Sequence, residues 1–134
     1  MPDRLLVVDA SALVELLLGG RQAPQIAEAM SSHVLAAPAH LDVEVVSALA
    51  RLERAQVVTA GDLFEHVDDL ARAPISRYPL AHLSHLACAL RANVAVADAY
   101  YVALASSLDA ELVTLDERLA AACRTSDLCA VAML

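Results

Sequence analysis

Short apolar runs alternate with helical segments along this chain, and no other feature restricts the fold as strongly. The run Leu5–Val8 is continuous and partly β-branched, and it stops at Asp9, which is typical of a strand buried on both faces. By the same criterion, strands are predicted at residues 5–8, 33–37, 75–80, 111–115 and 129–134. Helices are predicted at residues 11–18, after Pro24, and at 40–55, 59–73, 82–91, 98–108 and 116–123. This alternation predicts an α/β fold of three layers, α/β/α, with a central parallel sheet of four to five strands.

The length and the apolar content predict a single folded domain over residues 1–134. A chain of 134 residues is close to one typical domain of about 150, and 59% of its residues are hydrophobic. The longest runs without a polar residue have seven members, far fewer than the roughly 20 needed to cross a bilayer. The N-terminal residues lack the basic region, apolar stretch and cleavage site of a secretory signal, so we expect a cytoplasmic protein without a membrane span.

The charge balance restricts the partners of the chain. Seventeen acidic residues oppose nine basic residues, all of them arginine, and the net charge is −8. Such a surface repels a polyanion unless metal ions or local groups of arginines intervene. Aromatic residues make up only 3% of the chain, so a platform that stacks the bases of single strands is not expected.

The cysteines and histidines form no recognisable disulfide or zinc pattern. Cys88, Cys123 and Cys129 are odd in number and lack a Cys-x-x-Cys spacing, so we expect reduced thiols in the core. His82 and His85 have the spacing that places two imidazoles on one helix face. No third ligand is evident nearby, and ordinary surface histidines are the favoured interpretation.

Acidic residues that lack the neighbours of ordinary surface charges are the main candidates for function: Asp9, Glu44, Asp98 and Asp116. None of them has an arginine three or four positions away, whereas Asp68 has Arg72 four residues on, the pattern of a solvated helix face. Asp9 and Asp116 end or follow predicted strands, and the site of an open α/β sheet lies beyond the carboxyl ends of its strands.

Each of these acids also has a structural interpretation. Asp9 and Asp98 are well placed as helix N-caps, and Asp116 lies in a first helical turn, where negative charge is favourable. Glu44 lies in the middle of a predicted helix beside leucine and alanine, where it has no capping role.

Acids that meet at one rim of a sheet repel each other and raise their pKa values unless a cation joins them. Mg²⁺, with Mn²⁺ as an alternative, prefers oxygen ligands and works with one or two carboxylates, waters and substrate phosphates. Such an ion generates or orients a hydroxide and stabilises charge on a phosphate being cleaved. The four acids therefore favour a hard-metal site that acts on a phosphate ester.

Segments that contain these acids resemble a known family, the PIN-domain ribonucleases, and more narrowly the VapC toxins of toxin–antitoxin pairs. They are LVVDASAL at residues 6–13, PAHLDVEVVSALAR at 38–51, ADAYYVALA at 97–105 and LVTLDERL at 112–119. The segments occur in the right order and at the right separations, and the resemblance covers nearly the whole chain.

The resemblance implies a PIN-like fold and hydrolysis of RNA phosphodiester bonds by a metal-activated water. It implies that Asp9 and Asp98 bind Mg²⁺ and that Glu44 and Asp116 complete the site, directly or through water. Two further residues, Ser11 and Thr114, would position water or a carboxylate. The resemblance also implies a homodimer that a VapB-type antitoxin holds inactive.

Other interpretations fit the residues less well. A phosphoacceptor receiver domain also has acids at strand ends, but it needs a lysine, and this chain has none. A phosphatase of the haloacid dehalogenase type needs Asp-x-Asp after the first strand, where Asp9 is followed by Ala10 and Ser11. The remaining alternative is a catalytically silent PIN-like module for protein interaction, and the intact acids argue against it.

Three expectations concern the surface. The apolar segments Leu13–Leu18 and Leu41–Leu52 carry more hydrophobic surface than a small sheet buries, which predicts an interface with a second copy, an antitoxin or both. An acidic groove also attracts an inhibitor segment that carries arginine or lysine. Arg51, Arg91 and Arg118 are the candidates for lining the RNA groove.

Overall fold

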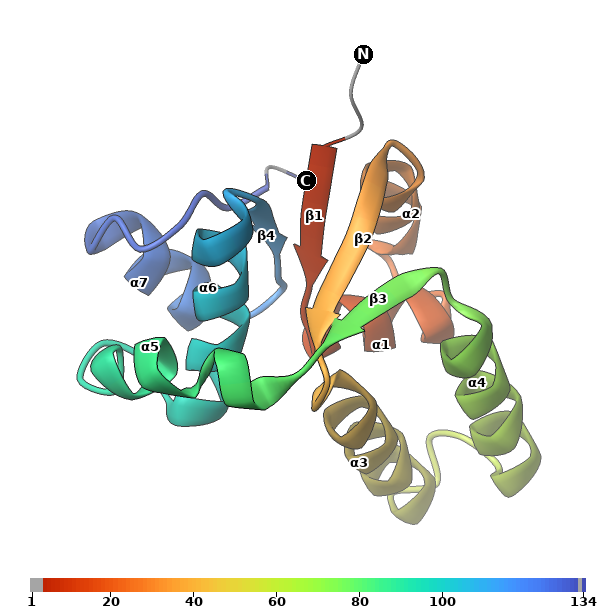
Figure 1. Cartoon of the computed structure of the whole chain (residues 1–134). Helices are drawn as coiled ribbons and strands as arrows, with labels where there is room; N and C mark the ends of the chain where they lie inside the picture. The colour runs from red at the N-terminus through yellow and green to blue at the C-terminus, as the bar shows by residue number, and fades with distance from the viewer. Residues whose placement is uncertain (1–3, 133) are drawn as a thin grey trace.

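The structure, a computed structural model that describes residues 4–132 and 134, has a parallel sheet at its centre. The sheet has four strands in the order β3-β2-β1-β4 (Figure 1). These strands are β1 (Arg4–Val8), β2 (His33–Pro38), β3 (Ile75–Tyr78) and β4 (Glu111–Val113). In the register, Val7 of the central strand β1 lies opposite Ala36 of β2 and Leu112 of β4. The predicted α/β class and parallel sheet are confirmed.

Helices cover both faces of this sheet. They are α1 (Ala10–Leu18), α2 (Ala23–Ser31), α3 (Leu41–Arg54), α4 (Ala60–Arg72), α5 (Ser84–Ala89), α6 (Val96–Leu108) and α7 (Glu117–Thr125), with a 3₁₀ turn η1 (Leu80–His82) before α5. Figure 1 shows α6 and α7 on one side of the sheet and α1 and α2 on the other, while α3 and α4 extend together beyond its edge. The three layers match the predicted α/β/α arrangement.

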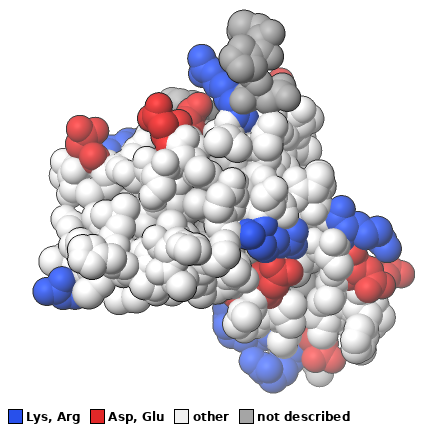
Figure 2. All heavy atoms as spheres, viewed as in Figure 1, with Lys and Arg blue, Asp and Glu red and all other residues white. Residues whose placement is uncertain are grey.

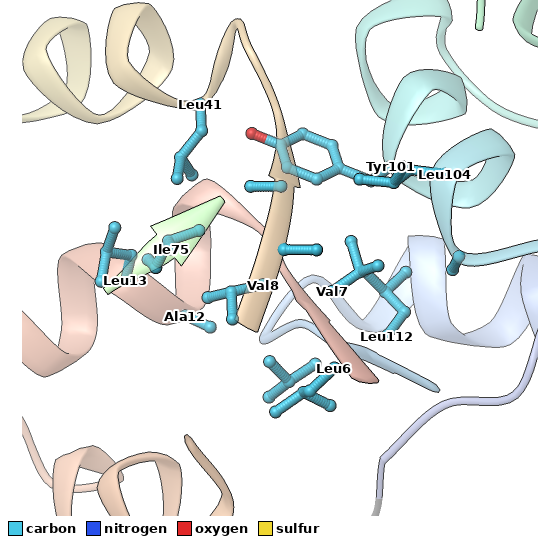
Figure 3. Packing of buried hydrophobic residues seen from close by; sticks show 14 of the residues in the cluster. Leu6, Val7, Val8, Ala12, Leu13, Leu41, Ile75, Tyr101, Leu104 and Leu112 are labelled. Carbon is cyan, nitrogen blue, oxygen red and sulfur yellow. The ribbon is translucent and has the colours of Figure 1, made fainter. Parts of the chain in front are cut away.

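The central strand fills the core. Leu6, Val7 and Val8 are fully buried, as the continuous apolar run predicts. Leu13 of α1 and Tyr101 of α6 lie on opposite sides of this strand (Figure 3). Burial of each such side chain contributes roughly 1.5–3 kcal/mol to stability, so the strand that carries Asp9 at its end is firmly held.

Several element boundaries differ from the prediction. The strand expected at 75–80 ends at Tyr78, because Pro79 has no N–H to donate to a sheet. The helix expected at 82–91 is divided into η1 and the short α5. The helix expected from residue 98 already begins at Val96, because Ala95 has the extended backbone of an N-cap.

The last predicted strand, at 129–134, is mostly absent. Within residues 4–132, it is reduced to one parallel bridge between Val131 and Leu112. The backbone N–H of Leu112 donates to Ala130, and its carbonyl accepts from Ala132, both at 2.9 Å. Met133 lies outside the described residues, so the end of this predicted strand is not compared.

The cysteines correspond only partly to the prediction of core thiols. Cys123 is buried and Cys129 half-buried, with their Sγ atoms 3.6 Å apart. The prediction is wrong for Cys88, which is exposed. The short α5 turns its Ala87 inward instead, and the neighbouring position therefore faces solvent.

Two smaller predictions concern surface groups. His82 and His85 are both exposed, in agreement with the interpretation as surface histidines. Arg72 pairs with Asp69, at 2.9 Å, rather than with Asp68 as the spacing predicted. Among the helices of the described residues, none is long and apolar enough to cross a bilayer.

Candidate functional site

The acids singled out in the sequence come together at the carboxyl end of the sheet. Asp9 directly follows β1, and Asp116 follows β4 after a short turn. Asp98 lies in the first turn of α6. Glu44 lies in the first turn of α3, so the prediction of a mid-helix position is wrong. The helix begins at Leu41, one residue after the predicted start, and either start places Glu44 near the beginning of the helix. Chain segments that are distant in sequence thus supply one rim.

The capping roles differ in part from the prediction. Asp9 is the N-cap of α1, as predicted, and its side chain accepts from the backbone N–H of Ala12. Asp98 is not an N-cap, because that position belongs to Ala95. Asp116 is the N-cap of α7 rather than a residue of its first turn, because its own backbone is still extended.

One cavity of about 320 Å³ is lined by all four acids. Ser11, Arg51 and Tyr101 line the same cavity. Thr114 is not among the residues that line this cavity, but its hydroxyl donates a hydrogen bond to Asp9. The structure therefore brings together every residue that the sequence assigned to the site.

Asp9 is the most restrained of the carboxylates. Its Oδ1 accepts from the Ser11 hydroxyl at 2.7 Å and from the Ala12 N–H at 3.0 Å, and its Oδ2 accepts from the Thr114 hydroxyl. Only 5% of Asp9 is exposed. Burial raises its pKa to about 6 although these hydrogen bonds oppose the rise, and the charge of Asp98 raises it further.

Ser11 and Thr114 connect the ends of two strands. The Ser11 hydroxyl accepts from the Leu115 N–H at 2.9 Å, and the Thr114 hydroxyl accepts from the Asp116 N–H at 3.0 Å. Both hydroxyls also donate to Asp9. The turn after β1 and the turn after β4 are thereby tied to a single carboxylate.

Replacing Thr114 with valine tests this connection. The hydroxyl is buried and donates to a buried carboxylate, so its loss is expected to lower the free energy of unfolding by about 1–3 kcal/mol. Urea unfolding at neutral pH measures the change. Thr125→Val, at an exposed position on α7, is the control. Equal stability of the two variants would contradict a stabilising role for the hydrogen bond between Thr114 and Asp9.

Asp98 is half-buried and has free carboxylate oxygens. Among residues 4–132 and 134, no side-chain or backbone donor forms a hydrogen bond with it. Burial raises its pKa, and the charges of Asp116 and Glu44 raise it further, while His40 lowers it. The acids are therefore close enough to repel one another, which a bound cation would relieve.

Tyr101 is a site residue that the sequence did not reveal. Its hydroxyl donates to Oε1 of Glu44 at 2.7 Å, and its ring is almost completely buried. His40 stands 3.6 Å from the same oxygen, and its Nε2–H donates to the carbonyl of Ala97. The spacing from Asp98 to Tyr101 places both on one side of α6, and this was the only available signal.

The side chains of the site are suited to a hard divalent ion that the protein coordinates only in part. The four acids offer only carboxylate oxygens, which such ions prefer. No three Asp, Glu, His or Cys side chains in the described part of the chain converge closely enough to enclose an ion by themselves. Mg²⁺ does not need such a cage, because it binds through one or two carboxylates, several waters and the substrate phosphate.

The chain is similar to known proteins over most of its length. The family model described as PIN domain matches residues 6–124. Ribonuclease VapC3 of Mycobacterium tuberculosis is 37% identical over 122 residues, which cover 90% of this chain and 89% of VapC3. The VapC ribonuclease Mb0985 of Mycobacterium bovis is 39% identical over 115 residues, which cover 86% of this chain and 88% of that protein.

A solved structure has a similar fold. The crystal structure of PAE2754 from Pyrobaculum aerophilum matches with a TM-score of 0.66 and 25% sequence identity. The match covers 89% of this chain and 79% of that chain. The two proteins therefore share a fold over most of this chain.

Proposed function

The chain belongs to the PIN-domain family, and from this premise we propose that it is a VapC-type ribonuclease toxin that hydrolyses RNA phosphodiester bonds with the help of Mg²⁺. The observation that carries the proposal is the cavity at the carboxyl end of the sheet, which four carboxylates line. The names of the VapC relatives supply the substrate class, RNA. Mn²⁺ is the alternative ion, because it accepts the same oxygen ligands.

Asp9 and Asp98 are the proposed metal ligands, and Glu44 and Asp116 complete the site directly or through water. When bound, the ion supplies Lewis acidity toward the phosphate and lowers the pKa of a water molecule. Three hydrogen-bond donors keep Asp9 in one orientation. The oxygens of Asp98 remain available because no donor from the described part of the chain occupies them.

Ser11, Thr114 and Tyr101 act through the acids. Ser11 and Thr114 fix the carboxylate of Asp9, and Tyr101 fixes that of Glu44. A fixed carboxylate loses little conformational freedom when it orients a ligand or a water molecule. These residues are therefore positioning residues.

Removal of divalent ions tests the proposed activity. The purified protein is expected to cleave single-stranded RNA with Mg²⁺ or Mn²⁺ and to lose this activity in EDTA, because four uncompensated carboxylates repel the phosphate backbone. Gel analysis of a labelled RNA measures cleavage, and re-addition of the ion is the control. Undiminished cleavage in EDTA would contradict the metal mechanism.

Replacing Tyr101 with phenylalanine isolates one hydrogen bond. The ring remains in the core, but Glu44 loses the donor at 2.7 Å, so the rate of cleavage at saturating Mg²⁺ is expected to fall about tenfold. Initial rates across a range of metal concentrations provide the measurement. Tyr100→Phe removes a hydroxyl that bonds Ser84 instead and is the matched control. If both variants keep the wild-type rate, Tyr101 has no positioning role.

A VapB-type antitoxin and a second copy of the chain are the proposed protein partners. Residues 78–90 contain no charged side chain, and Figure 2 shows a broad surface over α5 and α6 with almost no charge. Val43 and Phe64, on α3 and α4, are 67% and 69% exposed. Uncharged and apolar surfaces of this kind support both association with a second copy and binding of an antitoxin.

A further inference from the structure

Two neighbouring cavities share carboxylates of the acidic site. The cavity lined by all four acids reaches toward α3 and contains Arg51. A second cavity, of about 390 Å³, reaches toward the start of α7 and contains Arg118 and Asn93. Asp98 and Asp116 line both cavities. The shared acids thus lie between one arginine on the α3 side and another on the α7 side.

Both of these guanidinium groups lack a partner among the residues that the structure describes. Within the described residues, neither Arg51 nor Arg118 has an acid within 4.0 Å or an acceptor for a side-chain hydrogen bond. By contrast, Arg77 pairs with Asp42 and Arg72 with Asp69. An arginine that stands beside carboxylates without pairing to them remains available to an anionic ligand.

The structure also excludes other arginines from this arrangement. Arg91, a candidate in the sequence, lines neither cavity and donates to the carbonyl of Cys88. Arg124 lines a different cavity that includes Asp116 but neither Asp9 nor Asp98. Arg54 lies one turn beyond Arg51 on α3 and lines neither of the two cavities.

We propose that Arg51 and Arg118 form two phosphate subsites on opposite sides of the carboxylates and bind the RNA phosphates that flank the cleaved bond. This assignment rests on the proposed ribonuclease function and specifies how the strand lies on it. A planar guanidinium suits a phosphate because it donates two parallel hydrogen bonds. The two arginines offset the repulsion between the acids and the backbone on either side of the reacting phosphate, without neutralising the acids themselves.

RNA binding in a cleavage-deficient background tests the subsites. In an Asp98→Asn protein, titration of a fluorescent single-stranded RNA is expected to show about fivefold to tenfold weaker binding for Arg51→Ala and for Arg118→Ala. The slope of log affinity against log salt is expected to fall by about 0.7 for each change, the value for one phosphate contact on a single strand. Arg51→Lys and Arg118→Lys keep the charge and are expected to keep the slope.

Matched controls come from the same helices. Arg54→Ala on α3 and Arg124→Ala on α7 remove arginines that are also exposed and are expected to leave affinity and slope unchanged. If all four alanine variants weaken binding equally, the effect is one of net charge, and the assigned subsites are wrong. If Arg51→Ala and Arg118→Ala bind like the parent, the subsites are also wrong.

Cleavage in the otherwise wild-type protein separates this inference from the proposed function. Arg51→Ala and Arg118→Ala are expected to raise KM about fivefold to tenfold, with a smaller change in kcat, because their contacts lie outside the reacting phosphate. If the protein cleaves no RNA but the salt slope of RNA binding still depends on the two arginines, the assigned subsites stand and the proposed ribonuclease function is wrong. If the protein cleaves RNA and both variants have an unchanged KM, the ribonuclease function stands and the assigned subsites are wrong.

Discussion

Replacing Asp98 with asparagine is expected to lower the rate of RNA cleavage about a thousandfold, which corresponds to about 4 kcal/mol of transition-state stabilisation. Asp98 has carboxylate oxygens without a protein hydrogen bond in the described structure, so they are free to bind an ion. Asparagine keeps the shape but removes the charge that holds a divalent cation. Initial rates with Mg²⁺ and with Mn²⁺ measure the loss.

The fold should survive this change, and that makes the comparison informative. Asp98 is only half-buried and does not cap α6, so thermal unfolding of the metal-free variant is expected to match or exceed that of the wild type. Asp68→Asn, on the exposed surface of α4, is the control for loss of one negative charge. Wild-type cleavage by Asp98→Asn would remove Asp98 from the metal site and leave the cavity without its most available ligand.

Replacing Asp9 with asparagine is expected to abolish cleavage and yet to stabilise the metal-free protein by about 2 kcal/mol at pH 7–8. The cause is the cost of burying this carboxylate, which raises its pKa from an ordinary 3.8 to about 6. A shift of this size corresponds to about 3 kcal/mol of lost stability when Asp9 is ionised. Asparagine avoids the charge, remains a good N-cap for α1 and retains part of the hydrogen bonding.

The raised pKa of Asp9 also determines how the free energy of unfolding depends on pH. Between about pH 4 and pH 6 the folded protein holds a proton on Asp9 that the unfolded chain has already released. The Asp9 contribution therefore favours folding at low pH and is lost as the pH rises toward and through about 6. Urea unfolding in EDTA from pH 4 to pH 8 should show this loss in the wild type and not in Asp9→Asn. The same pH dependence in both proteins would contradict the burial cost assigned to Asp9.

The results expected for these two variants have one explanation: the acidic site lowers the stability of the metal-free protein and favours binding of a cation. Burial raises the pKa of Asp9 and of Asp98, and the charges of neighbouring acids raise both further. A divalent ion that binds only the folded protein would offset that cost, so the proposed metal is expected to stabilise the wild type more than Asp9→Asn.

The sequence alone determined the fold class and the members of the acidic site. Apolar runs such as Leu5–Val8 are short, β-branched and continuous, a pattern that suits strands buried on both faces. Because a strand of this kind points its carboxyl end toward the site, Asp9 could be assigned from its place in the chain. Glu44 and Asp98 lie in helices and not at strand ends, and they were singled out because no arginine lies three or four positions away. The resemblance of four segments to one family then supported both.

The tertiary structure alone decided how these residues contact each other. The strand order, the hydrogen bond from Tyr101 to Glu44 and the tie between Ser11, Thr114 and Asp9 join residues up to 105 positions apart. Local propensity and periodicity report on neighbours within a few residues, so they hold no information about such pairs. The positions of side chains around a cavity depend on how the helices pack on the sheet. For the same reason, only the folded structure shows that Arg51 and Arg118, and not the other arginines, lie beside the acids.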